Sequence, residues 1–289
     1  MKINTIILSM LVSAIVLAAI PAQARTVIQN KGSDTLVNVA QAWAEEYQNV
    51  STDVAIAVSG GGSGTGIAAM INGTVDIANA SRKMKDKEIK MAREHGHNPV
   101  EHVVGYDALA VYLHPDNPLD KLSLSQLGEI YGRKGKAESW SDLGVTVPGC
   151  KNNEIVVVSR QNNSGTYAYF RKAVLGKVKY RSGTLDMHGS KDVVDLVEKT
   201  PCAIGYSGLA YATDHVKLAC ISKDGETCVS PNIATAVDRS YPIARPLFMY
   251  TNGEPEGEIK KYMDWVMSDV GQCIIHNKGY APVKTVECK

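Results

Sequence analysis

The sequence lacks the patterns that mark several common classes of protein. No pair of its six cysteines has the Cys-x-x-Cys spacing of a zinc ribbon, a haem attachment site or a redox motif. Its glycine-rich stretch, Ser59 to Gly66, matches neither the Walker nor the dinucleotide-binding pattern. Thr65 also breaks the Gly-x-Ser-x-Gly of serine hydrolases. These absences argue against a nucleotide enzyme and a serine hydrolase.

The chain also lacks a large net charge. The chain has 31 basic and 30 acidic residues, and loss of Lys2 with an export signal would leave 30 of each. Proteins that bind nucleic acids usually present a basic surface. We therefore expect no nucleic-acid partner.

The first 24 residues have the features of a removable export signal. Lys2 precedes an apolar run from Ile6 to Ile20, and Ala22-Gln23-Ala24 is a small-x-small cleavage site. The sequence therefore predicts export with cleavage near Ala24. No cysteine lies near this point to carry a lipid, so we expect a free periplasmic protein, with secretion as the alternative.

In an exported chain the cysteines are expected to form disulfides. Cys220 and Cys228 flank a hairpin-type turn, and Cys273 with Cys288 would clip the C-terminal tail. That leaves Cys150 with Cys202. We interpret the three bridges as stabilising, since the chain is long enough to fold around its own core.

Strand and helix patterns alternate through the first part of the chain. Apolar strands at 26–29 and 54–59 are each followed by helical periodicity, at 36–47 and 67–71, and a charged helix is expected at 86–94. This alternation predicts an α/β fold with a mainly parallel sheet.

Two long apolar runs divide the chain into two lobes. The runs 103–113 and 241–250 are long enough to pass between domains, and Pro242 and Pro246 make the second an edge or crossover strand. We expect one lobe from residues 25–105 plus 243–289 and the other from 106–242. A ligand cleft would lie between them.

Hydroxyl and glycine residues gather where strands give way to helices. Three such turns are Ser33 to Leu36, Ser63 to Gly66 and Ser164 to Thr166, with Ser81 at a fourth. Helix N-termini and bare backbone amides bind anions, and Arg160 adds a fixed cation. The alternatives are simple helix capping at residues 33–35 and a flexible loop at 59–66.

These motifs together resemble the periplasmic phosphate-binding proteins of phosphate ABC transporters. The resemblance rests on Gly-Ser-x-Thr-Leu at 32–36, the glycine stretch followed by DIANASR at 76–82, and Arg-x-x-x-Ser-Gly-Thr at 160–166. GYDALAVYL, LSLSQLGEIYG and GYAPV extend it over nearly the whole chain after residue 24. It implies the two-lobed fold of type II binding proteins, closure over phosphate, and delivery to a membrane permease.

The resemblance also implies which residues donate to the ligand. The expected donors are Thr35, Leu36, Ser63, Arg160, Ser164, Gly165 and Thr166, with Gly64 and Arg82 as secondary candidates; Arg82 either adds a cation or pairs with an acid such as Asp86. Ser81 stands where related proteins carry an aspartate that accepts the proton of bound phosphate. Serine can accept a hydrogen bond but lacks the charge that repels a fully deprotonated anion.

The sequence thus predicts a monomeric binding protein without enzymatic activity or cofactor. The alternatives are a binding protein for sulfate, tungstate or a phosphonate, and a secreted phosphate scavenger unconnected with transport. A metal site at His95, His97 and His102 is disfavoured, because ligands at the usual spacing are lacking around them.

Overall fold

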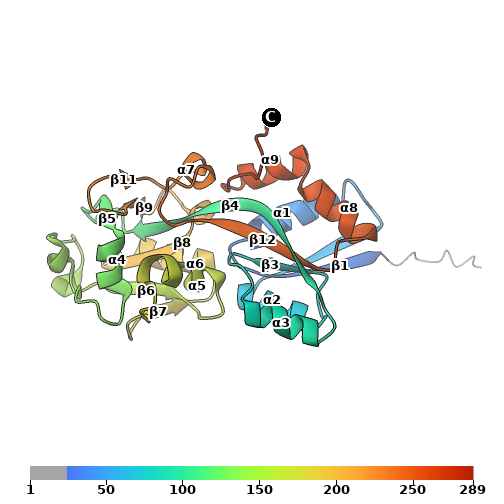
Figure 1. Ribbon diagram of the computed structural model, residues 1–289. Coiled ribbons are helices and arrows are strands. Elements are labelled where there is room, and N and C mark those ends of the chain that lie inside the picture. The colour runs from blue at the N-terminus through green and yellow to red at the C-terminus, as the bar shows by residue number, and fades with distance from the viewer. Residues whose placement is uncertain (1–24, 289) are drawn as a thin grey trace, which may run out of the picture.

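The computed structural model describes residues 25–288, so the proposed export signal lies outside the described residues. Figure 1 shows two bodies side by side, joined by two long strands that run through both. Within the described residues, no helix combines the length and the apolar character needed to cross a membrane. The chain has a two-lobed α/β fold.

The strands alternate with helices along most of the chain. The strands are β1 (Thr26–Gly32), β2 (Val54–Ser59), β3 (Ile77–Ala80), β4 (Pro99–Leu113), β5 (Lys121–Ser123), β6 (Val156–Arg160), β7 (Leu185–Met187), β8 (Ala203–Gly208), β9 (Lys217–Leu218), β10 (Cys220–Ser222), β11 (Cys228–Val229) and β12 (Ala244–Asn252). The α-helices are α1 (Val37–Tyr47), α2 (Ser63–Ile71), α3 (Asp86–Glu94), α4 (Leu124–Tyr131), α5 (Gly165–Phe170), α6 (Ser190–Lys199), α7 (Ile233–Val237), α8 (Gly257–Val266) and α9 (Asp269–Asn277). Short 3-10 turns occupy Trp140–Leu143, Lys151–Asn153 and Leu209–Tyr211, and α5 continues as one wide π turn over Arg171–Leu175.

Among the described residues, nine strands form one sheet in the order β2-β1-β3-β12-β4-β8-β6-β7, with β9 beside β4. The pairs β1/β2, β1/β3, β6/β7 and β6/β8 are parallel. However, β12 is antiparallel to β3 and β4, and β4 is antiparallel to β8 and β9. The expectation of a mainly parallel sheet was therefore wrong. The two connecting strands run in opposite directions, so they introduce antiparallel pairs at the centre.

Strand β12 crosses between the lobes, as its length suggested, but it is central in the sheet rather than at an edge. Pro246 lies opposite Tyr106 of β4, and the register shifts directly afterwards, between Leu247 and Phe248. A β-bulge is one of the few places where a sheet tolerates proline.

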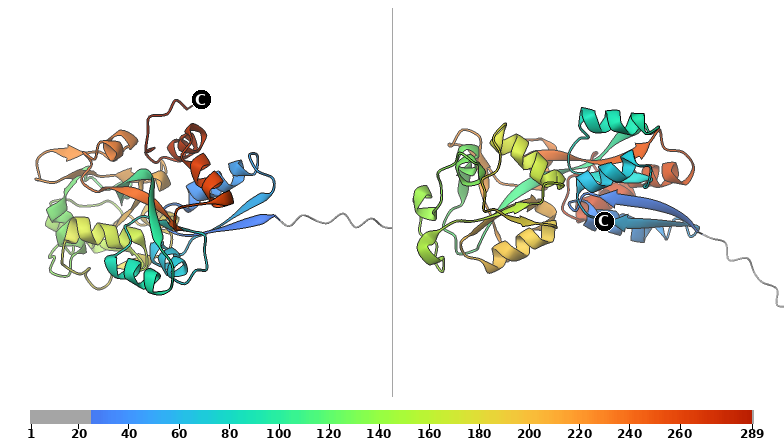
Figure 2. Two further views of the ribbon diagram at one scale, coloured as in Figure 1. Left: turned by 45° about the vertical axis from the view of Figure 1, so that its right-hand side comes forward. Right: turned by 90° about the horizontal axis from the view of Figure 1, so that it is seen from below.

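Each body has its own apolar core. We call β1–β3 with α1–α3, α8 and α9 the first lobe, and β5–β11 with α4–α7 the second lobe. Trp43, Ile77 and Tyr262 are buried in the first, and Trp140, Phe170 and Tyr206 in the second. Figure 2 shows the same two bodies from two further directions. The residue boundaries given above for the lobes remain a prediction.

Three disulfides tie surface segments to these cores. They join Cys150 to Cys202, Cys220 to Cys228 and Cys273 to Cys288, which is the pairing expected from the sequence. The third one anchors the C-terminal tail to α9, a helix that the sequence analysis did not foresee.

A disulfide that closes a longer loop should stabilise the protein more than one that closes a shorter loop. Replacing Cys150 and Cys202 by serine should lower the free energy of unfolding by about 4 kcal/mol, because the bridge spans 52 residues. The same change at Cys220 and Cys228, 8 residues apart, should cost about 2.5 kcal/mol. Urea unfolding of the two variants measures both values. The reverse order would contradict the chain-entropy account.

Candidate functional site

The turn after β1 directs its polar side chains toward other elements instead of capping α1. Gly32 has φ of 145°, and a Cβ there would lie 2.2 Å from the carbonyl oxygen of Asn79, so only glycine fits. Helix α1 has Leu36 as its N-cap and no side-chain cap. The capping interpretation of residues 33–35 was therefore wrong.

Ser33 and Thr35 are buried and reach two different partners. Ser33 Oγ donates to Ser81 Oγ at 2.9 Å, and Thr35 Oγ1 lies 3.0 Å from Thr166 Oγ1 in the second lobe. The amide of Leu36 donates to the carbonyl of Ser33 at 3.0 Å and its side chain is in the core, so this expected donor is engaged within its own turn.

The glycine stretch is an ordered turn that begins α2. Gly62, with φ of 91°, is the N-cap, and Ser63 begins the helix. Ser63 Oγ accepts from the amide of Ser81 at 3.0 Å and lies 3.3 Å from Ser81 Oγ. The amide of Gly64 donates to the carbonyl of Asn163 in the second lobe at 2.8 Å. Gly64, a secondary candidate, is thus engaged in a contact between the lobes.

The second lobe contributes the start of α5. Ser164 is the N-cap, and its Oγ accepts from the amide of Thr166 at 3.1 Å. Gly165 lies against the first lobe, since a Cβ on it would be 2.2 Å from Ser63 Oγ and 2.5 Å from Ser81 Oγ. The hydroxyls of both lobes therefore meet at one place. We call Ser33, Thr35, Ser63, Ser81 and Thr166 the hydroxyl cluster.

Arg160, at the end of β6, is buried and bridges the lobes. Its Nη2 is 3.2 Å from Asp34 Oδ2 of the first lobe and donates to the carbonyl of His188 at 2.7 Å, while Nη1 donates to Ser190 Oγ at 3.0 Å. Burial lowers the pKa of the guanidinium, and the carboxylate of Asp34 opposes that shift. Tyr211 reinforces this contact by donating to the carbonyl of Asp34 at 2.6 Å, and burial raises the pKa of Tyr211 to about 12, so this hydroxyl keeps its proton.

The structure adds a second arginine that the sequence analysis missed. Arg245 Nη2 lies 3.2 Å from Thr35 Oγ1 of the first lobe and 3.1 Å from Thr166 Oγ1 of the second. This cation therefore contacts hydroxyls of the cluster that come from both lobes. Its Nε and Nη2 donate to Asp107 Oδ2 at 3.0 and 2.7 Å, and both side chains are fully buried. Burial raises the pKa of the Asp107 carboxyl, and Arg245 opposes the rise.

A signal for this pair was present in the sequence. Asp107 is the one charged residue in the apolar run 103–113, and Arg245 is the one charged residue in the run 241–250. Strands β4 and β12 place them directly opposite each other. Opposite charges in two otherwise apolar strands indicate a buried pair, because an unpaired buried charge is very costly.

Arg82 does not join the cluster. Its guanidinium makes two 2.8 Å hydrogen bonds to the carboxylate of Glu88, so it pairs with an acid, though not with Asp86.

The three histidines at 95, 97 and 102 make separate hydrogen bonds, to Ile71, Asn252 and Thr251 respectively. Across residues 25–288, no group of three His, Cys, Asp or Glu side chains could hold a metal ion.

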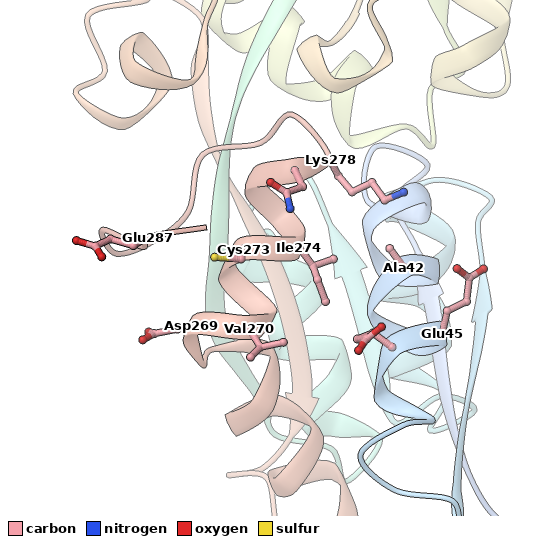
Figure 3. Close-up of a pocket in the computed structure, with 10 residues that line it drawn as sticks. Ala42, Glu45, Asp269, Val270, Cys273, Ile274, Lys278 and Glu287 are labelled. Carbon is pink, nitrogen blue, oxygen red and sulfur yellow. The ribbon is translucent and has the colours of Figure 1, made fainter. Parts of the chain in front are cut away.

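A groove of about 530 Å³ between α1 and α9 contains none of these residues (Figure 3). Its walls include Ala42 and Glu45 of α1, Val270 and Ile274 of α9, and Lys278, which directly follows α9. It is apolar with charged edges and belongs to the first lobe alone. The chemistry of the hydroxyl cluster is quite different, since donors from two lobes and two buried arginines suit a small oxyanion.

The comparisons with known proteins agree with this chemistry. A model described as PBP superfamily domain matches residues 19–270. The phosphate-binding protein PstS of Pseudomonas aeruginosa is 34% identical over 268 residues, covering 89% of this chain and 83% of the relative. PstS of Bacillus subtilis is 32% identical, with 87% and 79% covered.

A solved structure is similar throughout. It is a putative phosphate ABC transporter substrate-binding protein from Clostridium perfringens with bound phosphate, with a TM-score of 0.79 and 29% identity. The match covers 90% of this chain and all of that protein.

The close approach of Gly165 to two hydroxyls gives a test of the arrangement between the lobes. Gly165→Ala should hold the lobes apart, because its Cβ would overlap Ser63 Oγ and Ser81 Oγ, and alanine is otherwise well suited to a helix. Small-angle scattering in saturating phosphate should give a larger radius of gyration than for the unaltered protein. Gly128→Ala in α4 is the matched control, since nothing lies within 4 Å of its Cβ. Equal radii for the two variants would contradict the packing described for Gly165.

Proposed function

The chain belongs to the PBP superfamily, and we propose on this basis that it captures inorganic phosphate outside the cytoplasm and delivers it to the membrane permease of an ABC transporter. It is a binding protein and not an enzyme. The observation that carries the proposal is the meeting of Thr35 and Thr166, from different lobes, at Nη2 of Arg245. Phosphate oxygens would replace the contacts that these groups make with one another.

The proposed ligand site combines neutral donors with compensated cations. The residues assigned to it are Thr35, Leu36, Ser63, Ser81, Arg160, Ser164, Gly165 and Thr166, with Arg245 added. Hydroxyls give directed hydrogen bonds to phosphate oxygens, and the arginines give charge-assisted ones. Asp34 and Asp107 each offset one arginine. The two negative charges of hydrogenphosphate would then be balanced chiefly by local dipoles.

Direct contacts between the two lobes support a cycle of opening and closing. Arg160–Asp34, Thr35–Thr166 and Gly64–Asn163 all join the first lobe to the second. Binding proteins with two lobes close around their ligands by hinge motion. We infer that the closed form of a monomer presents phosphate to the permease from the periplasm; the alternative is a scavenger released from the cell.

The choice between phosphate and sulfate depends on Ser81. Ser81 Oγ accepts a hydrogen bond from Ser33 and can also accept from a protonated oxyanion, but it carries no charge. Tungstate and phosphonates are the other anions that such donors could hold. Calorimetric titration with phosphate and then sulfate, on protein unfolded, dialysed and refolded to remove any bound ligand, tests the proposal directly. Heat of binding with phosphate but not with sulfate supports the proposal. The absence of any heat of binding with phosphate contradicts it.

Arg160 should be essential for tight binding. Arg160→Ala should weaken phosphate binding roughly 100-fold, since hydrogen bonds to charged groups contribute about 1.5–3 kcal/mol each. Arg82→Ala, which removes an arginine bound to Glu88 instead, is the control and should change the affinity little. Calorimetry measures both affinities. Unchanged binding by Arg160→Ala would remove this residue from the site.

Arg245 should contribute to binding in the same way. Removing it alone would leave the buried carboxylate of Asp107 unpaired, so the informative variant is Arg245→Gln combined with Asp107→Asn. It should bind phosphate at least 10-fold more weakly, from the loss of one charge-assisted donor. Urea unfolding serves as the control for stability. Full affinity in a folded double variant would show that the pair is only structural.

A further inference from the structure

A cavity of about 470 Å³ adjoins the hydroxyl cluster, and five cations line it: Arg82, Lys83, Lys85, Lys172 and Arg239. We call this cavity the cationic vestibule. Among its lining residues there is no carboxylate. Such a concentration of one sign of charge is unexpected on a chain whose basic and acidic residues nearly balance.

Nearby acids offset only part of this charge. Glu88 pairs with Arg82 at 2.8 Å and lies 3.9 Å from Lys85, and Glu101 pairs with Lys83 at 2.9 Å. Lys172 and Arg239 are exposed and have no ion-pair partner in the part of the chain that the structure describes. Five cations therefore face two carboxylates.

The vestibule adjoins the proposed ligand site. Ser81 lines it and also belongs to the hydroxyl cluster. Tyr169 lines it too, and the guanidinium of Arg245 lies 5.8 Å from the centre of the Tyr169 ring. Its walls come from both lobes and from β12, which places it at the seam where the lobes meet.

The buried arginines cannot supply a long-range attraction. Arg160 and Arg245 lie 3.2 and 2.7 Å from the carboxylates of Asp34 and Asp107, so at a distance each pair acts as a dipole. Uncompensated surface charge acts over roughly the Debye length, about 8 Å at physiological ionic strength. Clefts lined by one sign of charge can raise association rates by a factor of about 10 to 1,000.

We propose that the cationic vestibule guides small oxyanions toward the hydroxyl cluster and so increases the rate of association. The inference rests on the proposed function, since it concerns access to the same site. Lys172 and Arg239 carry most of the effect because, among the cations that line the vestibule, only these two make no ion pair in the described part of the chain. Neither residue belongs to the proposed donor set. Their replacement should therefore leave the dissociation rate of phosphate unchanged.

The test compares association rates at low and high salt. Lys172→Glu combined with Arg239→Glu should lower the association rate of phosphate about 10-fold at low salt, and about 0.5 M salt should abolish most of the difference by screening. Stopped-flow measurement of the intrinsic fluorescence gives the rates. Calorimetry at both salt concentrations is the second readout, because the dissociation constant should rise by the same factor.

Lys134→Glu combined with Lys278→Glu is the control, since both lysines are exposed, do not line the vestibule, and give the same change of net charge. This variant should leave the association rate within about 2-fold of the unaltered protein. An equal fall in both variants would overturn the inference, as would a loss of affinity that arises from faster dissociation. Phosphate binding by the unaltered protein at a salt-independent rate would overturn it while leaving the proposed function intact. Failure of the unaltered protein to bind phosphate would overturn both.

Discussion

The antiparallel pairing of β4 with β12 is the interaction on which the rest of the structure depends. These two strands run through both bodies, and their register places Arg245 opposite Asp107. The other residues of the candidate site lie at or just after the ends of β1, β3 and β6, or at the starts of α2 and α5. A one-residue slip of β12 would turn Arg245 to the opposite face of the sheet. The register of two strands thus fixes the position of a buried cation.

Burying two arginines is costly unless each is paired and hydrogen-bonded. Here each guanidinium has a carboxylate partner and further acceptors, from the backbone or from hydroxyls. The two arginine–aspartate pairs differ in whether they join the two lobes. Arg160 and Asp34 lie on different lobes, so their bond depends on the relative position of the lobes, whereas Arg245 and Asp107 lie on adjacent strands. The first pair can break as the lobes separate, while the second moves as a unit.

Much of the fold follows from local patterns in the sequence. The bounds of β2 and α3 are those that periodicity indicated, and the three disulfides follow from export and spacing. The turns bearing Thr35, Ser63 and Thr166 were also identified, because glycine and hydroxyl residues before a helix have a recognisable chemistry. Sheet direction was harder to predict, since a long strand can run either way through a sheet. Arg245 and Asp107 were missed because their partnership depends on strands 138 residues apart in the sequence.

The last residues before the tail form a further connection between the two bodies. Tyr280 is buried in the core of the first lobe and donates to the carbonyl of Thr35, whereas Ala281 packs in the core of the second and exchanges two backbone hydrogen bonds with Tyr106. Two strands alone would permit the lobes to twist as well as bend. In the proposed cycle of opening and closing, a third link at residues 280–281 would restrain the twist. Closure would then bring the same pairs of side chains together each time.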